Sequence, residues 1–214
     1  FEEVPNMQHR IANLAMIEGK VSICATEMME SMRTNHRPTR AEVADVAGAV
    51  REGFSAVMLS AETATGYDPI NAVTAMARIC DANETHDGAK SYADAHPTES
   101  AVGAATAALA KRTGAASIIA LTYSGYSSEI LSACRPAACI IAATPSPEVA
   151  RRLRLYWGVT PIVCQRNIDM SVAVDDAFNA AVDEGLVQSN ELVVVCASRE
   201  NIRSAADTIW VHNA

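Results

Sequence analysis

Short, continuous apolar runs alternate along this chain with longer stretches whose apolar residues recur at helical spacing. In the first part, VSICA (21–25) and SAVMLS (55–60) predict strands buried on both faces, because they lack the alternation of a half-exposed strand. Helical patterns come before, between and after these two runs. This order is typical of strand–helix units with parallel strands, so we expect an α/β fold.

Local signals give the expected helix boundaries in this first part. Asn6 can cap a helix that includes Ile11 and Leu14, while Thr39 and Glu42 form a capping box at the start of a second helix. A third helix begins at Asp68-Pro69, with proline in the first turn. Its expected apolar stripe consists of Ile70, Val73, Met76, Ala77 and Cys80.

The composition changes at 81–97, which is polar and has little apolar periodicity. We therefore expect two domains, 1–90 and 91–214. The second repeats the alternation, with Pro161 placing its strand at a sheet edge. The short connection before the last strand predicts antiparallel pairing, and hence a small, mostly parallel five-stranded sheet. Its strands are expected at 117–121, 139–144, 160–164, 191–197 and 208–213, and its helices near 98–113, 126–134, 147–156 and 170–186.

Bulk composition excludes several functions. The net charge is −8 and the 17 lysines and arginines are scattered, which argues against nucleic-acid binding. No apolar run approaches the roughly 18 residues of a membrane span, and no signal peptide is visible, so we expect a cytoplasmic or organellar protein and no membrane partner. The 6 cysteines form no C-x-x-C pair and are expected to be reduced and buried.

The first domain is expected to be incomplete. Two strands and three helices cannot close a parallel barrel, which needs eight such units. They would leave apolar strand edges unpaired. The sequence also opens with Phe-Glu-Glu-Val-Pro and no initiator methionine, as if within a fold. We expect a processed product, a part of a longer chain or the product of a divided gene.

Three segments, ICATEMMESM (23–32), RPTRAEVADVAGAV (37–50) and VMLSAETATG (57–66), resemble pyruvate kinase in order and spacing. The resemblance implies that residues 1–90 are the last β/α units of a TIM-type (β/α)8 barrel. It implies that residues 91–214 are the family's C-terminal regulatory domain. Members of the family transfer phosphoryl from phosphoenolpyruvate to ADP, use Mg²⁺ (or Mn²⁺) and usually K⁺, and form tetramers.

The resemblance also implies roles for particular residues. Thr26 matches the family's active-site threonine at the catalytic end of a barrel strand, although a threonine after a strand can also be a simple cap. The residues expected at the nucleotide side are Ser60, Glu62 and Thr63, and those expected near a subunit interface are Arg37 and Arg40. The chain departs from the family at Glu27, usually glutamine, and at Ala61, usually glycine.

In the second domain, the loop TYSGYSS (122–128) lies between a strand and a helix, where hydroxyls and free amides favour phosphate. By resemblance it binds a sugar bisphosphate effector, although the same loop can serve only as a helix cap. Tyr123 and Tyr126 replace the family's basic residues, and arginines of a later loop could restore the charge. The expected effector residues are Thr122, Ser124, Gly125, Ser127, Arg199 and Arg203.

The family's catalytic lysine and its two metal-binding carboxylates precede the first residue of this sequence, and Lys20, Lys90 and Lys111 do not fit the lysine's role. We therefore expect no metal ligands on this chain and no catalysis by it alone. The favoured reading is the C-terminal portion of a pyruvate kinase, active when another chain or segment completes the barrel in a homo- or hetero-oligomer. The alternatives are a non-catalytic structural or regulatory subunit and a free-standing phosphometabolite-binding module.

Overall fold

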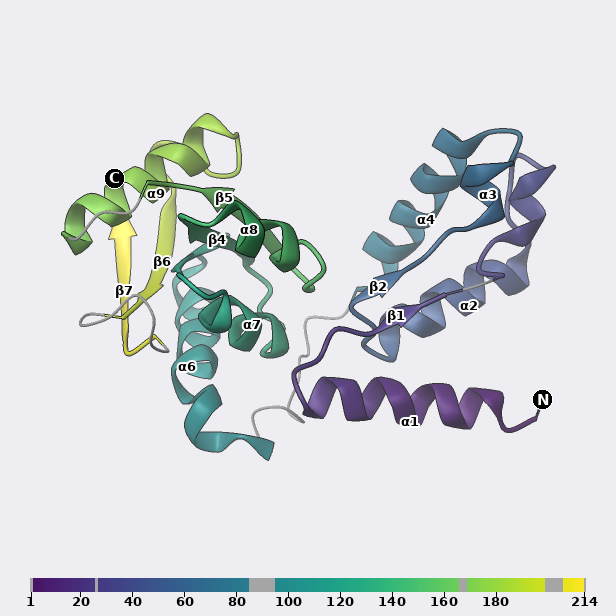
Figure 1. Cartoon of the computed structure of the whole chain (residues 1–214), viewed down its shortest axis with the longest axis horizontal. Coiled ribbons are helices and arrows are strands. Elements are labelled where there is room, and N and C mark those ends of the chain that lie inside the picture. The colour runs from purple at the N-terminus through teal and green to yellow at the C-terminus, as the bar shows by residue number, and fades with distance from the viewer. Residues whose placement is uncertain (1, 26, 85–94, 166–168, 199–205, 214) are drawn as a thin grey trace. The chain divides into compact units, whose positions relative to one another are not determined.

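In the computed structural model, the chain forms two compact units, Phe1–Thr85 and His86–Ala214. Figure 1 shows a two-stranded unit at the N-terminal end of the chain and a five-stranded unit at the C-terminal end. The structure describes residues 2–25, 27–84, 95–165, 169–198 and 206–213. The α/β fold expected from the alternating pattern is confirmed.

The first unit pairs two very short parallel strands. Its elements are α1 (Val4–Ile17), β1 (Ile23–Cys24), the 3-10 turn η1 (Glu30–Arg33), α2 (Arg40–Arg51), β2 (Ala56–Val57), α3 (Ala61–Ala64) and α4 (Pro69–Asn83). Ile23 pairs with Ala56 and Cys24 with Val57. The prediction that both strands are buried on both faces was wrong, since Ile23 is 48% exposed. Among the described residues each strand has only one neighbour, so its other edge is unpaired.

The start of α1 also differs from the prediction. The N-cap is Glu3 and not Asn6, because Pro5 occupies the first turn, where its missing N–H costs no hydrogen bond. The Asn6 side-chain amide instead donates to the Glu3 carboxylate at 3.4 Å. The predicted capping box of α2 is present, with the Thr39 hydroxyl accepting from the Glu42 amide.

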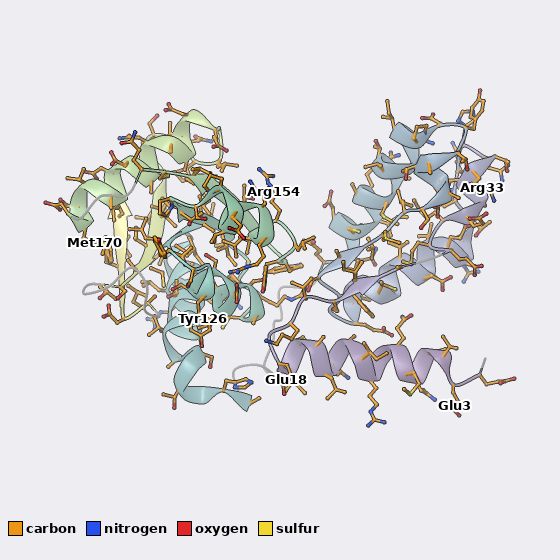
Figure 2. All side chains as sticks on the ribbon, viewed as in Figure 1. Glu3, Glu18, Arg33, Tyr126, Arg154 and Met170 are labelled. Atoms are coloured by element: carbon orange, nitrogen blue, oxygen red, sulfur yellow. The ribbon has the colours of Figure 1, made fainter. Side chains whose placement is uncertain are left out.

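Much of the apolar stripe predicted for each of two helices is exposed rather than buried. In α1, Ile11 and Leu14 are 54% and 52% exposed. Figure 2, in which Glu3 and Glu18 mark the ends of α1, shows the side chains along this helix. In α4, Ile70 and Val73 are exposed as well. The buried face of α4 is formed instead by Ala72, Ala75 and Met76.

Methionine fills much of the interior of the first unit. Met28, Met29, Met32 and Met76 pack in one cluster with Phe54, and small residues of α1, α2 and α4 complete it. Partly buried sulfur groups of two cysteines contact the same cluster. The unit therefore has a single core on one side of a minimal sheet.

The second unit is a complete α/β sandwich. Its elements are α6 (Pro97–Thr113), β3 (Ser117–Leu121), α7 (Tyr126–Ala133), β4 (Cys139–Thr144), α8 (Pro147–Leu153), β5 (Val159–Val163), α9 (Met170–Asp183), β6 (Leu192–Ala197) and β7 (Thr208–Asn213). The strand order is β5-β4-β3-β6-β7. The prediction of an antiparallel last strand is confirmed, and Pro161 lies in the edge strand β5, as expected.

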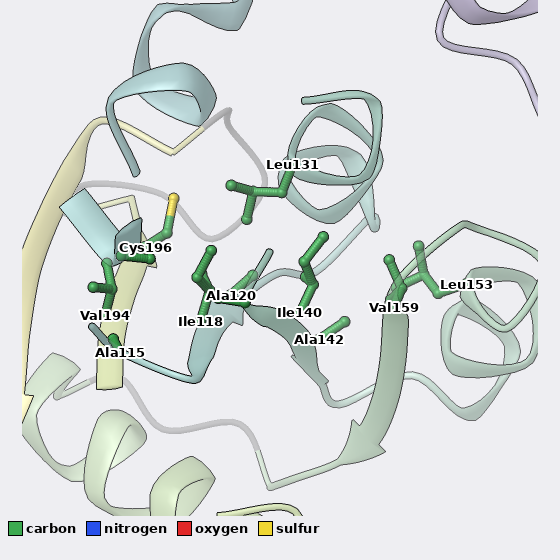
Figure 3. Packing of buried hydrophobic residues seen from close by; sticks show 12 residues of the cluster. Ala115, Ile118, Ala120, Leu131, Ile140, Ala142, Leu153, Val159, Val194 and Cys196 are labelled. Atoms are coloured by element: carbon green, nitrogen blue, oxygen red, sulfur yellow. The ribbon is translucent and has the colours of Figure 1, made fainter. Parts of the chain in front are cut away.

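Both faces of this sheet are covered by packed side chains. On one face, Ile118, Ile140 and Val194 form a cluster with Leu131 of α7, as Figure 3 shows. On the other face, Ile119, Ile141 and Val195 belong to a second cluster that includes Phe178 of α9. Fully buried parallel strands explain the continuous apolar runs in the sequence.

Candidate functional site

The parallel pairing of β1 and β2 brings two loops to the same edge of the first unit. Each loop follows the carboxyl end of its strand, the end at which barrel enzymes place their reactive groups. The first loop begins after Cys24 and leads into η1, and the second runs from Met58 into α3. Thr26, the expected catalytic residue of the first loop, lies outside the described residues.

Glu62 is the most deeply buried charged side chain that the structure describes, with 1% exposure. One carboxylate oxygen accepts from the Met29 amide at 3.0 Å, and the other accepts from the Ser60 amide at 2.8 Å. Burial by itself opposes ionisation, but the amides of Glu62, Ser60 and Met29 outweigh it and lower the pKa of this carboxyl. Glu62 is thus an anion that links the two loops.

A second carboxylate holds the same first loop from another helix. Glu42, in the first turn of α2, accepts from the Ser31 amide at 2.7 Å and from its hydroxyl at 2.5 Å. It also accepts from the Thr39 amide at 2.7 Å. Partial burial opposes its ionisation, but the donors at Ser31 and Thr39 lower the pKa of the Glu42 carboxyl. The capping-box pattern indicated Thr39, but no sequence signal indicated Ser31.

The other expected residues of this edge are accessible. Ser60 is exposed, and Thr63 is half-buried, with its hydroxyl donating to the Ser60 carbonyl at 3.2 Å. Glu27 is exposed and has a positive φ of 53°, which is uncommon for a residue other than glycine. The expected interface residues Arg37 and Arg40 are exposed at the entrance to α2.

An apolar groove of about 460 Å³ lies between β2 and α4. It is lined by Val57, Met58, Leu59, Thr63, Val73, Met76, Ala77 and Cys80. Four of these residues belong to the predicted apolar stripe of α4. The stripe was therefore correctly identified as apolar, but much of it faces this groove.

The described part of the chain does not provide a metal site. Among its residues, no group of three or more His, Cys, Asp or Glu side chains is arranged to hold a metal ion. The six cysteines are free, as expected, but the prediction that they are buried holds fully only for Cys196, since Cys139 is exposed and the other four are partly buried. Burial raises the pKa of Cys134 and of Cys196 to about 11, so both are protonated small hydrophobes at neutral pH.

In the second unit, the loop after β3 forms a compact turn at the start of α7. The Thr122 hydroxyl accepts from the Gly125 amide at 2.9 Å, and Gly125 adopts a positive φ of 92°, which glycine tolerates. Arg152 of α8 donates to the Ser124 carbonyl and, at 2.8 Å, to the Glu129 carboxylate. No local sequence motif indicates that Arg152 reaches this loop.

The same turn contacts the segment that precedes β7. The Ser127 hydroxyl accepts from the Ala206 amide at 3.2 Å, although 79 positions separate the two residues. A cavity of about 20 Å³ lies beside this contact and is lined in part by Cys196 at the end of β6. The turn and the end of β6 therefore meet at the carboxyl edge of the sheet, where β3 is flanked by β4 and β6. Arg199 and Arg203 lie outside the described residues.

These features define a class of protein in which strand–helix units with parallel strands are joined to a doubly wound α/β domain. Comparison with known proteins is consistent with both parts. The family described as "Pyruvate kinase, barrel domain" matches residues 1–73. The family described as "Pyruvate kinase, alpha/beta domain" matches residues 100–212. This chain belongs to the pyruvate kinase family.

Similar proteins agree with this assignment. A pyruvate kinase of Agrobacterium vitis is 40% identical over 200 residues, which cover 91% of this chain and 42% of that protein. A pyruvate kinase of Methylorubrum extorquens is 42% identical over 206 residues, with coverages of 92% and 42%. The crystal structure of a pyruvate kinase from Cryptosporidium parvum matches with a TM-score of 0.89 and 30% identity, covering 99% of this chain and 44% of that one. The chain thus spans about two fifths of the length of these relatives.

None of the helices in the described part of the chain combines the length and the apolar character that a membrane span requires.

Proposed function

We propose that this chain is the C-terminal portion of a pyruvate kinase and that it takes part in phosphoryl transfer from phosphoenolpyruvate to ADP when a further segment completes its barrel. The observation that carries the proposal is the two-stranded parallel sheet, whose loops carry Ser60, Glu62 and Thr63 and whose outer edges are not paired within the described chain. The proposed catalytic residue is Thr26, by its match to the family motif.

The groove beside β2 supports completion by a further strand. It presents Val57 and Leu59 of the strand segment and Val73 and Met76 of α4 as one apolar surface. Exposed edges of this kind are templates for strand pairing. In a closed barrel of parallel strands, each strand has a neighbour on both sides, and a helix covers the outer face. A strand docked in this groove would bury the side chains that the sequence pattern marks as interior.

The exposed face of α1 supports completion at the other edge. Val4, Met7, Ile11 and Leu14 recur at spacings of three and four and are each about half exposed. Residues at these spacings share one face of a helix. A partner that covers this face and the groove beside β2 would be another β/α segment, supplied by the same polypeptide or by a second chain in a homo- or hetero-oligomer.

The family uses Mg²⁺ (or Mn²⁺) and K⁺, and the described residues offer no group of three or more His, Cys, Asp or Glu side chains that could hold a metal ion. We therefore assign no ligand and no chemical step of either ion to this chain. The proposed contribution of this chain is the edge at the carboxyl ends of β1 and β2, which carries the hydroxyls of Ser60 and Thr63. Arg37 and Arg40, exposed at the start of α2, are proposed to contact a neighbouring subunit.

The chain is proposed to divide into two domains, 1–90 and 91–214. The second is proposed to be the regulatory domain. Its proposed effector site is the turn formed by Thr122, Ser124, Gly125 and Ser127, together with Arg199 and Arg203. The hydrogen bond from Ala206 to Ser127 supports this pairing, since it ties the turn to the segment that follows the two arginines. A phosphate of a sugar phosphate is the ligand expected at such a turn. A cytoplasmic location stays a prediction.

The test is complementation. The full 214-residue chain should give no pyruvate from phosphoenolpyruvate and ADP with Mg²⁺ and K⁺ present. Adding the part of the Agrobacterium vitis pyruvate kinase that precedes its match to this chain should restore turnover, with that part alone as the control. A normal rate from the chain alone would contradict the need for completion.

An alternative is a non-catalytic structural or regulatory subunit. The observation that favours it is Glu27, whose exposed carboxylate would repel an anionic substrate at this edge. Formation of a complex with the complementing part but no turnover, followed by turnover in Glu27→Gln, would support this alternative. No complex at all would argue against both readings.

A further inference from the structure

The role of Glu62 follows from three observations at the edge of the first unit. Its side chain is 1% exposed, so a ligand cannot reach it without rearrangement of the loops. Its two oxygens accept from amides of two different loops, Met29 after β1 and Ser60 after β2. A buried anion with two backbone donors is a strong and directional link, since charge-assisted hydrogen bonds are stronger than neutral ones.

The loop that receives this link is constrained on several sides. Met28 and Met29 are 4% and 0% exposed and fix the loop to the core. Glu27, just before them, holds a positive φ of 53°, a conformation that persists only where the surroundings determine it. Glu42 holds Ser31 further along the same loop. The backbone that follows position 26 in the sequence is therefore held by Glu62 of α3, by Glu42 of α2 and by the packing of Met28 and Met29 in the core.

We propose that Glu62 is a positioning residue, which fixes the loop after β1 and the loop after β2 in one relative register and does not itself contact the nucleotide. This inference rests on the proposed function, because the two loops are proposed to carry Thr26 and Ser60. It changes the role expected for Glu62 from the sequence, which was a place at the nucleotide side.

The charge of Glu62 is part of this arrangement. The amide donors lower its pKa although burial opposes ionisation, so it is ionised at neutral pH. The charge of Glu42 of α2 opposes the ionisation of Glu62, and the charge of Glu62 in turn raises the pKa of Arg33 of η1, after the larger effect of Glu30. Replacing the carboxylate by an amide would turn one of the two acceptors into a donor that faces a backbone N–H.

The first experiment measures amide exchange in the full chain by ¹⁵N NMR. In Glu62→Gln, exchange of the Met29 or Ser60 amide that faces the new NH2 group should increase by at least tenfold. Glu30→Gln is the matched control, because Glu30 lies in the same loop but makes an exposed ion pair with Arg33. If both amides keep their wild-type protection in Glu62→Gln, the proposal is wrong.

A second measurement does not depend on the folding of a variant. In the wild-type chain, the Met29 and Ser60 amide resonances should move together during acid titration, with one common pKa below 4.5, the ordinary value for glutamate. Two separate transitions, or a transition in only one amide, would show that a single carboxylate does not hold both loops.

Kinetics of the complemented enzyme then separate positioning from ligand contact. Glu62→Gln should lower kcat at least tenfold and leave the KM for ADP unchanged within twofold, because positioning acts on the reacting geometry. A large rise in KM with little change in kcat would identify Glu62 as a nucleotide contact and overturn the proposal. If the wild-type complemented enzyme is inactive, the proposed function fails, while the exchange and titration data still decide whether Glu62 links the loops.

Discussion

Gly66 lies directly against the carbonyl of Glu62. A Cβ atom at position 66 would come within 2.1 Å of the Glu62 carbonyl oxygen, a backbone atom that cannot rotate away. Gly66→Ala should therefore distort the end of α3 and destabilise the first unit by about 1–3 kcal/mol, as overpacking does. Hydrogen exchange of the α3 and η1 amides in the full chain measures this loss.

The matched control is Gly48→Ala in α2. Apart from its two chain neighbours and the backbone of its own helix, no described atom lies within 4 Å of the position that its Cβ would occupy, so the substitution adds no clash. Alanine should stabilise the helix by up to about 1 kcal/mol, because glycine is a poorer helix former. Equal destabilisation by both substitutions would contradict the steric reading of Gly66.

Two serines of α7 should respond in opposite ways to the same substitution. The Ser128 hydroxyl is buried without a hydrogen-bond partner among the described residues, whereas the Ser132 hydroxyl donates to the Trp157 carbonyl at 2.7 Å. Ser128→Ala should be neutral or slightly stabilising, while Ser132→Ala should cost about 1–3 kcal/mol. Urea unfolding followed by tryptophan fluorescence reports both, and a larger loss in Ser128→Ala would refute the assignment.

Acid should weaken the first unit through its two linking carboxylates. The pKa values of Glu42 and Glu62 lie below 4.5 in the folded chain, so the unfolded chain binds more protons near that pH. Their contribution is complete above pH 4.5 and is lost as the pH falls through the lowered folded values. Thermal unfolding between pH 3 and pH 7 should show this decline, and Glu42→Gln should reduce it. A flat profile would contradict it.

The apolar groove predicts that a substitution can block completion of the barrel without changing the stability of the chain. Val73 is 53% exposed and lines the groove, so Val73→Asp should leave the unfolding of the chain unchanged within about 0.5 kcal/mol. It should abolish binding of the complementing part, since a charge would be buried without a partner. Ile70→Asp, at an 80% exposed position outside the groove lining, is the control and should bind normally. Isothermal titration calorimetry compares the two.

Arg152 should set the affinity of the proposed effector turn. Because it donates to the Ser124 carbonyl and to Glu129, it holds the turn in place. Arg152→Ala should weaken the binding of a hexose bisphosphate about tenfold, which corresponds to about 1.4 kcal/mol. The exposed Arg154 at the end of α8 provides the control variant. Equal Kd values in calorimetry for wild type and Arg152→Ala would exclude this role.

The second unit was largely predictable from the sequence, because its central strands β3, β4 and β6 are buried on both faces and therefore read as continuous apolar runs. All five expected strands appear within one residue of their predicted limits, including the edge strand with Pro161. Helix ends were less accurate: α8 ends at Leu153, three residues before the predicted 156, because its last turn does not continue.

The first unit was predictable in order but not in burial. Apolar runs marked both strands, yet the strands are only two residues long because each has one neighbour. The apolar stripe of α4 was recognised, but the sequence pattern does not show whether residues of the same chain cover it. The links made by Glu62 and Arg152 were not predictable, because they lie beyond the reach of local motifs. Glu62 accepts from an amide 33 positions away, and Arg152 donates to residues 23 and 28 positions away.

The methionine-filled core of the first unit has a consequence for assembly. Met28, Met29, Met32 and Met76 have unbranched side chains with a soft sulfur atom, which can change conformation at low cost. A core of β-branched residues would be stiffer and would resist rearrangement when a further strand packs against it. If the proposed further strand docks beside β2, the thioether interior can redistribute its volume, and the first unit can then be stable both alone and in the proposed complex.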